Sequence, residues 1–244
     1  MALSDFWEGQ AERWVRWARE PGHDTYWRFH RDRFLDLLPP PGPLTVDVGC
    51  GEGRLARDLK ALGYTVLAVD RSPTMVLHAR AADPQLDIRK ADAAALPLAD
   101  GEADLVVSFM SLMNTDDLDA AVREAARVLG TAGRYCIALT HPLNTAGSFD
   151  SEEPDAHFVI DGSYFDRNAR EIPVERAGLE MTFLDAHRPL EDYFRAVEEA
   201  GFLVEQVREI PDSTKDPERP SFLRWRRIPL FLHIRAIAGV GSAG

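Results

Sequence analysis

The chain has 244 residues, of which 45% are hydrophobic and 28% charged, a size and balance that suit one large soluble domain. No apolar run approaches the roughly 20 residues of a membrane helix, and a formal net charge of −12 disfavours a nucleic-acid partner because it repels polyanions. The N-terminus lacks the basic start and apolar core of a signal peptide. The chain has two cysteines, Cys50 and Cys136, which form no disulfide pattern, so a cytoplasmic protein is expected.

The first 38 residues are predicted to form a helical cap. Apolar side chains recur near helical spacing through residues 1–20, and Pro21-Gly22 ends this pattern. Asp24 then favours the start of a second helix. The Pro-Pro-Pro-Gly-Pro run at 39–43 fits neither a helix nor a central strand, so it is predicted to be a stiff linker. The residues on the predicted buried face of the second helix are Trp27, His30, Phe34 and Leu38.

From residue 44 onward, short apolar runs alternate with helical stripes. This alternation predicts an α/β doubly wound fold over residues 44–237, with a mostly parallel sheet and helices on both of its faces. Residues 141–187 interrupt the pattern, which indicates an insertion that acts as a lid over the functional site. The predicted strands are residues 44–48, 65–69, 86–89, 103–107, 134–139, 202–207 and 230–237, with a further strand-like stretch at 172–184. The predicted helices are residues 55–62, 73–80, 116–129 and 189–201.

Three features near the C-terminus are predicted to be plain surface. Residues 211–220 form a polar loop with three prolines, and the last four residues form a disordered tail. The basic cluster of Arg224, Arg226 and Arg227 is expected to be solvated, with contact to a substrate or nucleic acid as the less favoured alternative.

The strongest functional signal is the segment Val46-Asp47-Val48-Gly49-Cys50-Gly51-Glu52-Gly53-Arg54, which follows the first predicted strand and opens a helix. Glycine allows a tight turn in which the backbone approaches a ligand closely. The helix start adds free N–H groups and a positive dipole end, which favour a carboxylate or a phosphate. The segment therefore indicates a nucleotide-type ligand rather than a bare turn.

Two aspartates follow the next predicted strands. Asp70 ends the second strand, where a carboxylate can accept both hydroxyls of a ribose. Alternatively it caps the following helix, a role for which Ser72 competes. Asp92 follows the third strand and can accept a hydrogen bond from an adenine amino group, or serve as an ordinary turn residue. In series with the glycine loop, both aspartates are predicted to contact the ligand.

Taken together, these motifs resemble those of the class I S-adenosylmethionine-dependent methyltransferases, in their small-molecule branch. The resemblance is strong over residues 44–140 and looser over residues 187–237. The matching segments are 46–53 for the first motif, Asp70 for the ribose acid, Ala91-Asp92-Ala93 for the adenine side, 104–109 for the strand beside the methionine end and 129–134 for the turn into the fifth strand.

The resemblance implies a Rossmann-like, seven-stranded sheet of order 3-2-1-4-5-7-6 with an antiparallel last strand. It implies S-adenosyl-L-methionine as cofactor and methyl transfer to an oxygen, nitrogen or carbon nucleophile of a small-molecule acceptor. We further expect a monomer or homodimer with no nucleic-acid or membrane partner. The residues expected at the cofactor are Tyr26, Asp47, Gly49, Cys50, Gly51, Gly53, Asp70, Arg71, Asp92, Ala93, Ser108 and Phe109.

Two other functions stay open. An NAD(P)-dependent oxidoreductase has the fingerprint G-x-G-x-x-G, but here the glycines alternate as Gly49, Gly51 and Gly53, and Arg54 stands at the third glycine position. No second half-domain is evident, so the oxidoreductase is disfavoured. The other alternative is a protein that binds S-adenosylmethionine without catalysis.

Acceptor chemistry is expected at the carboxyl edge of the sheet. His141 follows the fifth predicted strand and is either a general base or a histidine that fixes a loop. His187 is the second candidate base, with Arg188 as a partner for an acidic substrate, although contacts at the helix start are favoured for both. The other histidines have no metal-ligand spacing, so no metal site is predicted.

The aromatic side chains of the cap allow two interpretations. Trp7, Trp14, Trp17 and Trp27 are predicted mainly to pack the cap onto the core, and the alternative is that they cover the cofactor, whose sulfonium cation would be attracted to aromatic faces. For Tyr26 the two interpretations are equally favoured.

Overall fold

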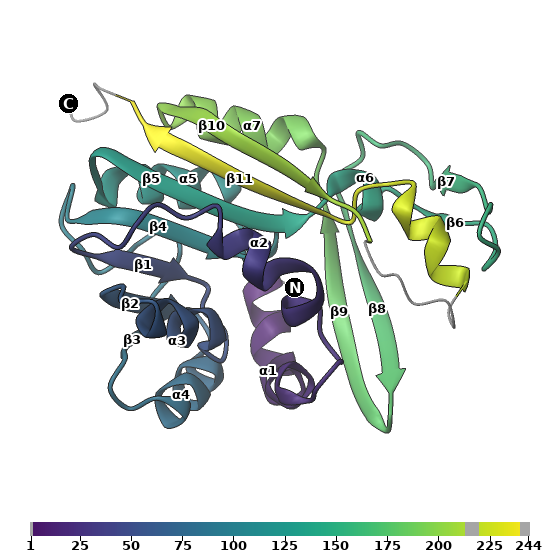
Figure 1. Ribbon diagram of the computed structural model, residues 1–244, viewed down its shortest axis with the longest axis horizontal. Coiled ribbons are helices and arrows are strands. Elements are labelled where there is room, and N and C mark those ends of the chain that lie inside the picture. Colours follow the sequence, from purple (N-terminus) through teal and green to yellow (C-terminus); the bar gives the residue numbers. More distant parts are fainter. Residues whose placement is uncertain (1, 213–219, 240–244) are drawn as a thin grey trace.

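A mostly parallel sheet forms the centre of the computed structural model, which describes residues 2–212 and 220–239 (Figure 1). In this part of the chain the sheet has seven strands in the order β10-β11-β5-β4-β1-β2-β3, and β11 alone runs antiparallel to its neighbours. The predicted fold class and strand order are confirmed. The strands are β1 (Thr45–Val48), β2 (Val66–Asp70), β3 (Asp87–Lys90), β4 (Ala103–Phe109), β5 (Leu129–Thr140), β10 (Phe202–Ile210) and β11 (Phe231–Ala238).

Helices cover both faces of the sheet, as the continuous apolar sequence of its central strands requires. One hydrophobic cluster joins strand side chains such as Val46 and Val106 to helices α5 and α7. A second cluster joins Ala68 and Leu105 to α2, α3 and α4 on the other face. The helices are α2 (Arg31–Leu35), α3 (Arg54–Ala61), α4 (Pro73–Ala82), α5 (Leu118–Val128) and α7 (Leu190–Glu199), with a 3-10 turn η2 (Leu112–Asn114) after β4.

The N-terminal cap matches the prediction in its first helix and departs from it in the second. Helix α1 (Leu3–Arg19) is amphipathic as expected. The second segment begins as a π-helix, η1 (Tyr26–His30), in which the Arg31 N–H bonds to the Tyr26 carbonyl. Because this i→i+5 turn is wider than an α-helical turn, side chains no longer share the expected face. Trp27 is 66% exposed, while His30 and Phe34 are buried, so the placement of Trp27 was wrong.

The insertion consists of a short helix and two hairpins. Helix α6 (Pro142–Thr145) leads into a small hairpin of β6 (Gly147–Phe149) and β7 (Phe158–Ile160). A longer hairpin of β8 (Asn168–Arg176) and β9 (Leu179–His187) projects from the end of the sheet, and β9 packs against α1 (Figure 1). The 3-10 helix η3 (Pro220–Arg226) lies beside the small hairpin through contacts such as Phe149 with Trp225.

Several predicted boundaries shift. Strand β10 continues to Ile210 because β11 pairs with it as far as Ile210 and Phe231. Leu62 was assigned to the buried stripe of the first sheet helix, but it follows the end of α3 and is 51% exposed. Residues 213–219 of the predicted polar loop and the predicted disordered tail lie outside the described residues. Among the residues that are described, no helix is both long enough and apolar enough to cross a bilayer.

Candidate functional site

A cavity of about 680 Å³ lies at the carboxyl ends of β1, β2 and β4, with α1 and the β8–β9 hairpin as its cover. Its size falls within the range of small-molecule sites, on the order of 300–1,000 Å³. The candidate cofactor residues that line it are Asp47, Gly49, Cys50, Gly51, Asp70, Arg71, Asp92, Ala93, Ser108 and Phe109. Tyr26, Gly53, His141 and His187 are not among the lining residues in the described part of the chain.

The glycine turn has a different reason for glycine at each position. Gly49 and Gly51 have φ angles of +74° and +56°, which L side chains rarely adopt. A Cβ at Gly49 would lie 2.4 Å from the Cβ of Ser111, so this glycine is required by packing within the protein. A Cβ at Gly51 would meet only the Nε1 of Trp14, at 3.5 Å. Gly51 therefore presents bare backbone to the cavity. Gly53 serves packing as well, since a Cβ there would lie 3.1 Å from that of Ala79.

Asp47 is a buried carboxylate with no close hydrogen-bond partner among the described residues, although the backbone N–H of Ala56 is near enough to oppose the rise in its pKa. Its residue is 1% exposed, and neither carboxylate oxygen has a hydrogen-bond partner among the described residues. Burial, with a smaller contribution from the charge of Asp70, raises the pKa of Asp47 to about 7. Buried carboxylates are nearly always hydrogen-bonded. Asp47 therefore fits a ligand that brings a donor or a cation into this end of the cavity.

Asp70 organises the turn from the second strand. Its Oδ2 accepts the Gly51 N–H at 2.8 Å, and its Oδ1 accepts the Ser72 N–H at 2.9 Å. Burial raises the pKa of Asp70, although these backbone bonds oppose the rise. The capping alternative goes to Ser72, whose Oγ accepts the Met75 N–H at the start of α4. Each carboxylate oxygen of Asp70 keeps acceptor capacity for a ligand.

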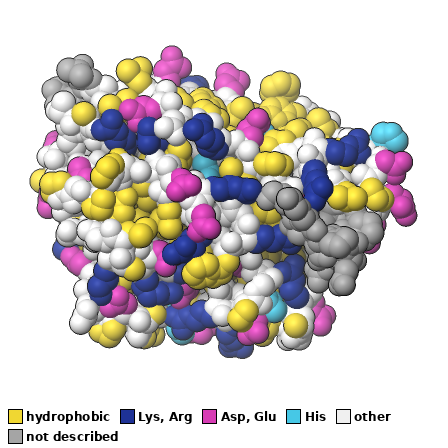
Figure 2. Space-filling view, in the orientation of Figure 1, with side chains coloured by type: hydrophobic (Ala, Val, Ile, Leu, Met, Phe, Trp, Pro, Cys, Tyr) yellow, Lys and Arg dark blue, Asp and Glu magenta, His cyan; other side chains and the backbone are white. Residues whose placement is uncertain are grey.

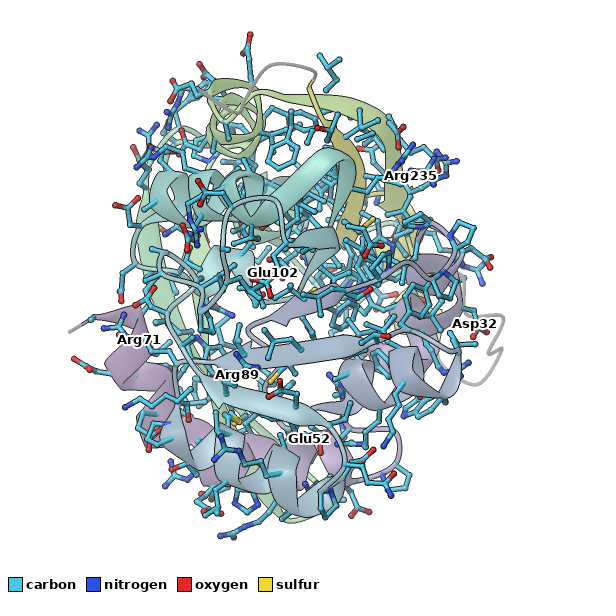
Figure 3. The ribbon with its side chains drawn as sticks, turned by 90° about the vertical axis from the view of Figure 1, so that its left-hand side faces the viewer. Asp32, Glu52, Arg71, Arg89, Glu102 and Arg235 are labelled. Carbon is cyan, nitrogen blue, oxygen red and sulfur yellow. The ribbon has the colours of Figure 1, made fainter. Side chains whose placement is uncertain are left out.

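Arg71 and Asp92 form an exposed pair at the edge of the cavity. Arg71 NH1 lies 3.3 Å from Asp92 Oδ2 and 3.0 Å from Asp116 Oδ2. Asp116 also accepts the Leu3 N–H at 2.7 Å, which places Arg71 beside the start of α1 (Figure 3). Asp92 Oδ1 accepts the Ala94 N–H, so this residue has the turn role as well as a position in the cavity wall.

The tryptophans of α1 both pack and line the cavity. Trp7, Trp14 and Trp17 are lining residues, and they meet one another or Phe183 of β9 edge to face, with ring centroids about 6 Å apart. Packing and cavity cover are therefore one arrangement, although packing alone was favoured. Glu8 fastens the same helix, because its carboxylate accepts hydrogen bonds from the hydroxyls of Ser72 and Thr74.

Tyr26 lies behind the cavity wall. Its hydroxyl donates to Asp58 Oδ2 at 2.8 Å, and the residue is 1% exposed. Burial and the Asp58 carboxylate raise the pKa of Tyr26 well above its usual value. The Arg54 guanidinium lies 4.6 Å from the centre of its ring and itself lines the cavity. Tyr26 thus packs behind Arg54, and Arg54 is the residue of the two that lines the cavity.

His141 and His187 both have structural partners. His141 Nδ1 accepts the Leu143 N–H at 3.0 Å and caps α6, and its Nε2 lies 3.2 Å from Glu209 Oε1. Burial lowers the pKa of His141, and the Glu209 carboxylate opposes this. His187 Nδ1 lies 2.5 Å from Thr145 Oγ1, and its Nε2 lies 2.8 Å from the Tyr164 carbonyl oxygen. These contacts match the loop-fixing alternative for His141. For His187 a contact at the start of the following helix was expected, but its partners are Thr145 at the end of α6 and Tyr164 in the loop before β8.

Arg188 is likewise engaged by the backbone. Its guanidinium donates to the carbonyls of Met113 and Thr115, at 2.7 and 2.8 Å. It therefore braces the loop after β4, and the geometry does not support the pairing with an acidic substrate. Within the described residues, no group of three or more His, Cys, Asp or Glu side chains is arranged to hold a metal ion.

Three polar residues of the cavity region were missed from the sequence. Arg54 had been read only as a departure from the dinucleotide fingerprint, although its place at the helix start directly after the glycines was a usable signal. Asp24 had been read only as a helix cap, and it also lines the cavity. Glu8 carried no signal, because its partners are 64 and 66 positions away.

Comparison with known proteins agrees with this geometry. Residues 46–137 match the family model of a methyltransferase domain. A probable S-adenosylmethionine-dependent methyltransferase of Mycobacterium tuberculosis is 37% identical over 130 residues, which cover 52% of this chain and 47% of that protein. A ubiquinone/menaquinone biosynthesis C-methyltransferase of Caulobacter vibrioides is 31% identical over 121 residues, with 44% and 48% covered. The chain thus spans about half the length of these curated relatives.

A solved structure covers more of the molecule. The crystal structure of an S-adenosylmethionine-dependent methyltransferase from Mesorhizobium loti superimposes with a TM-score of 0.69 at 26% identity. The match covers 88% of this chain and 98% of that one, so the similarity in fold extends well beyond residues 46–137.

Proposed function

We propose that the chain is an S-adenosylmethionine-dependent methyltransferase, as the match of its residues 46–137 to a methyltransferase domain supports, and that it transfers a methyl group from S-adenosylmethionine to an oxygen, nitrogen or carbon nucleophile of a small-molecule acceptor. The observation that carries the proposal is the pair of carboxylates, the buried Asp47 and the half-buried Asp70, on either side of the open backbone at Gly51 within one cavity.

The polar groups of the cavity fit the cofactor group by group. The unpartnered oxygens of Asp47 suit the α-ammonium of the methionine end. Asp70 has acceptor capacity for the ribose hydroxyls, while its bonds to the Gly51 and Ser72 N–H groups fix its orientation. The apolar side chains of Leu96 and Met113 line the same cavity and suit the adenine ring.

Positioning is the main task left to the protein in this reaction. The cofactor supplies, when bound, a methyl carbon that its sulfonium makes electrophilic. The rings of Trp14 and Phe109 line the cavity, where they exclude water and offer aromatic faces to a cation. Because His141 and His187 point to structural partners, we propose that orientation of the two reactants supplies most of the rate, without a histidine base.

The acceptor that suits this cavity is small and largely apolar. The walls on the hairpin side are Ile172, Val174 and Phe183, and Phe231 at the start of β11 lines the same cavity. A nucleic-acid acceptor fits poorly, since the net charge is −12 and acidic and basic side chains are interspersed over the face that Figure 2 shows. The basic cluster is also engaged by backbone, as Arg224 and Arg227 donate to the carbonyls of Glu152 and Ala156.

The test is isothermal titration of the purified chain with S-adenosylmethionine, S-adenosylhomocysteine and NAD, followed by an assay for S-adenosylhomocysteine release with a panel of small phenols, amines and carbanion-forming compounds. We expect binding of the first two ligands and no binding of NAD. Binding with no turnover on any acceptor would favour the binding-only alternative. Binding of NAD alone would overturn the proposal.

A further inference from the structure

Arg54 occupies an unusual place between the glycine turn and the cap. It is the first residue of α3, and its side chain is 16% exposed. The guanidinium carbon lies 4.6 Å from the centre of the Tyr26 ring and 5.5 Å from that of Trp14. Aromatic rings on its flanks hold the guanidinium in position and leave its N–H edges for partners.

The carboxylate that Arg54 meets in this structure is that of Asp24. Arg54 NH1 pairs with Asp24 Oδ2, and the Asp24 side chain is 7% exposed. Asp24 belongs to the turn between α1 and η1, and its Oδ1 accepts the Tyr26 N–H at 3.1 Å. Among the described residues no other carboxylate pairs with Arg54, and both members of the pair line the cavity. Burial, with the charge of Arg57, lowers the pKa of Arg54, and the Asp58 carboxylate opposes this.

The cavity therefore has a cation and a carboxylate on either side of the glycine turn, Arg54 after the glycines and Asp47, which has no close hydrogen-bond partner among the described residues, before them. The free amino-acid zwitterion requires this pair of complementary charges. Trp14 ties Arg54 to the ligand-facing backbone, because its Nε1 lies 3.5 Å from where a Cβ of Gly51 would be.

We propose that Arg54 binds the carboxylate at the amino-acid end of the cofactor, and that Asp24 is the protein's own carboxylate, which competes with the ligand for that guanidinium. The inference rests on the proposed function for the identity of the cofactor. The cofactor carboxylate must then displace the Asp24 carboxylate from Arg54 or share the guanidinium with it. Binding of the cofactor is therefore linked to the position of the turn that carries Asp24.

The test compares two ligands that differ in the amino-acid end. S-adenosylhomocysteine carries the carboxylate, and 5′-methylthioadenosine lacks the whole amino-acid group. In titration calorimetry, Arg54→Met is expected to weaken S-adenosylhomocysteine about 10- to 100-fold, the loss typical of a hydrogen bond to a charged group, and to leave 5′-methylthioadenosine within about 3-fold. Retained binding of 5′-methylthioadenosine shows that the variant is folded. Arg31→Met is the matched control, because Arg31 pairs with Asp58 outside the cavity lining.

Asp24→Asn tests the competition, since asparagine keeps the oxygen that accepts the Tyr26 N–H and loses the charge. We expect S-adenosylhomocysteine to bind at least about 3-fold more tightly and 5′-methylthioadenosine to be unaffected. Equal affinity of Arg54→Met and the wild type for S-adenosylhomocysteine would overturn the assignment while leaving the proposed function intact. A wild type that binds neither adenosine ligand would remove the proposed function itself. Weaker S-adenosylhomocysteine binding by Asp24→Asn would overturn the competition.

Discussion

Some single side chains in this molecule have roles that the surrounding sequence does not predict. Asp70 is the clearest case, because its carboxylate accepts hydrogen bonds from the N–H of Gly51 in the glycine turn and from the N–H of Ser72, the residue that caps α4. The ribose role and the structural role are therefore compatible, because the protein's own hydrogen bonds already arrange the turn for a ligand. Such preorganisation reduces the cost of ordering the site on binding.

Replacement of this carboxylate separates the two roles by magnitude. Asp70→Ala should weaken S-adenosylhomocysteine at least about 10-fold, because charge-assisted hydrogen bonds contribute about 1.5–3 kcal/mol each. The loss of its two backbone bonds should lower the free energy of unfolding by about 1–3 kcal/mol. Titration calorimetry and urea unfolding check both values. Unchanged affinity would show that the ribose lies elsewhere.

His141 is expected to matter for stability rather than for turnover. Its ring caps α6 through the Leu143 N–H and is not part of the cavity wall in the described residues. His141→Ala should cost about 0.5–2 kcal/mol of stability, as the loss of an N-cap does. The rate of methyl transfer should fall less than about 5-fold, against the about 10²–10⁴-fold of a lost general base. A larger fall in rate, together with loss of the alkaline limb of the pH–rate profile, would show that His141 acts as a general base.

At the scale of elements, the sequence was informative where backbone geometry and periodicity act locally. The strand-to-helix units and the turn at Gly49–Gly53 follow from apolar spacing and from φ angles that only glycine adopts readily. The π-helix at Tyr26–His30 has no such signal, since its extra residue per turn depends on the packing of His30 and Phe34 against the sheet. The partners of His141 likewise come from Leu143 and from the distant Glu209.

Helix α1 is held over the cavity by polar contacts that can be loosened one at a time. Glu8 joins it to Ser72 and Thr74, next to Asp70, and these hydrogen bonds lower the pKa of Glu8 against the effect of burial. Glu8→Ala should speed dissociation of S-adenosylhomocysteine about 5- to 30-fold. This change in rate is equivalent to a loss of about 1–2 kcal/mol from the contacts that hold α1 over the cavity.

Stopped-flow tryptophan fluorescence suits this measurement, because Trp7 and Trp14 line the cavity. Glu12→Ala is the matched control. Its carboxylate lies on the same helix, is exposed and pairs with His78 at 3.0 Å. If both variants release the ligand equally fast, the effect belongs to general weakening of α1 and not to the contact at Glu8.

At the scale of the whole molecule, a buried histidine pair and the buried carboxylate of Asp47 are expected to change the free energy of unfolding with pH in opposite directions. His30 Nδ1 lies 3.0 Å from His233 Nε2, and both residues are at most 1% exposed. Burial, with the charge of Arg33, lowers the pKa of His233 to about 4 and that of His30 well below its ordinary value. In the unfolded chain both protonate near about 6.5, so their contribution is complete above that pH and is lost as the pH falls through about 4.

Asp47 acts in the reverse direction. Its pKa of about 7 in the folded protein exceeds the about 3.9 of the unfolded chain. The folded protein therefore holds this proton more tightly, and the contribution is lost as the pH rises from about 4 through 7. His233→Gln should flatten the acid side of a stability profile by up to about 3 kcal/mol, and Asp47→Asn should flatten the opposite trend. Urea midpoints at a series of pH values from about 4 to 8 check both, and parallel profiles for all three proteins would contradict the assignment.

The edge-to-face contacts of Phe183 with Trp14 and Trp17 have a thermodynamic consequence. Phe183 belongs to the wall expected to face the acceptor, and Trp14 adjoins the glycine turn expected to face the cofactor. A ligand that immobilises one ring shifts the freedom of the next, so the two binding equilibria share a coupling free energy. Linkage then requires reciprocity. Whatever factor a bound acceptor adds to the retention of the cofactor, the cofactor adds to the retention of the acceptor.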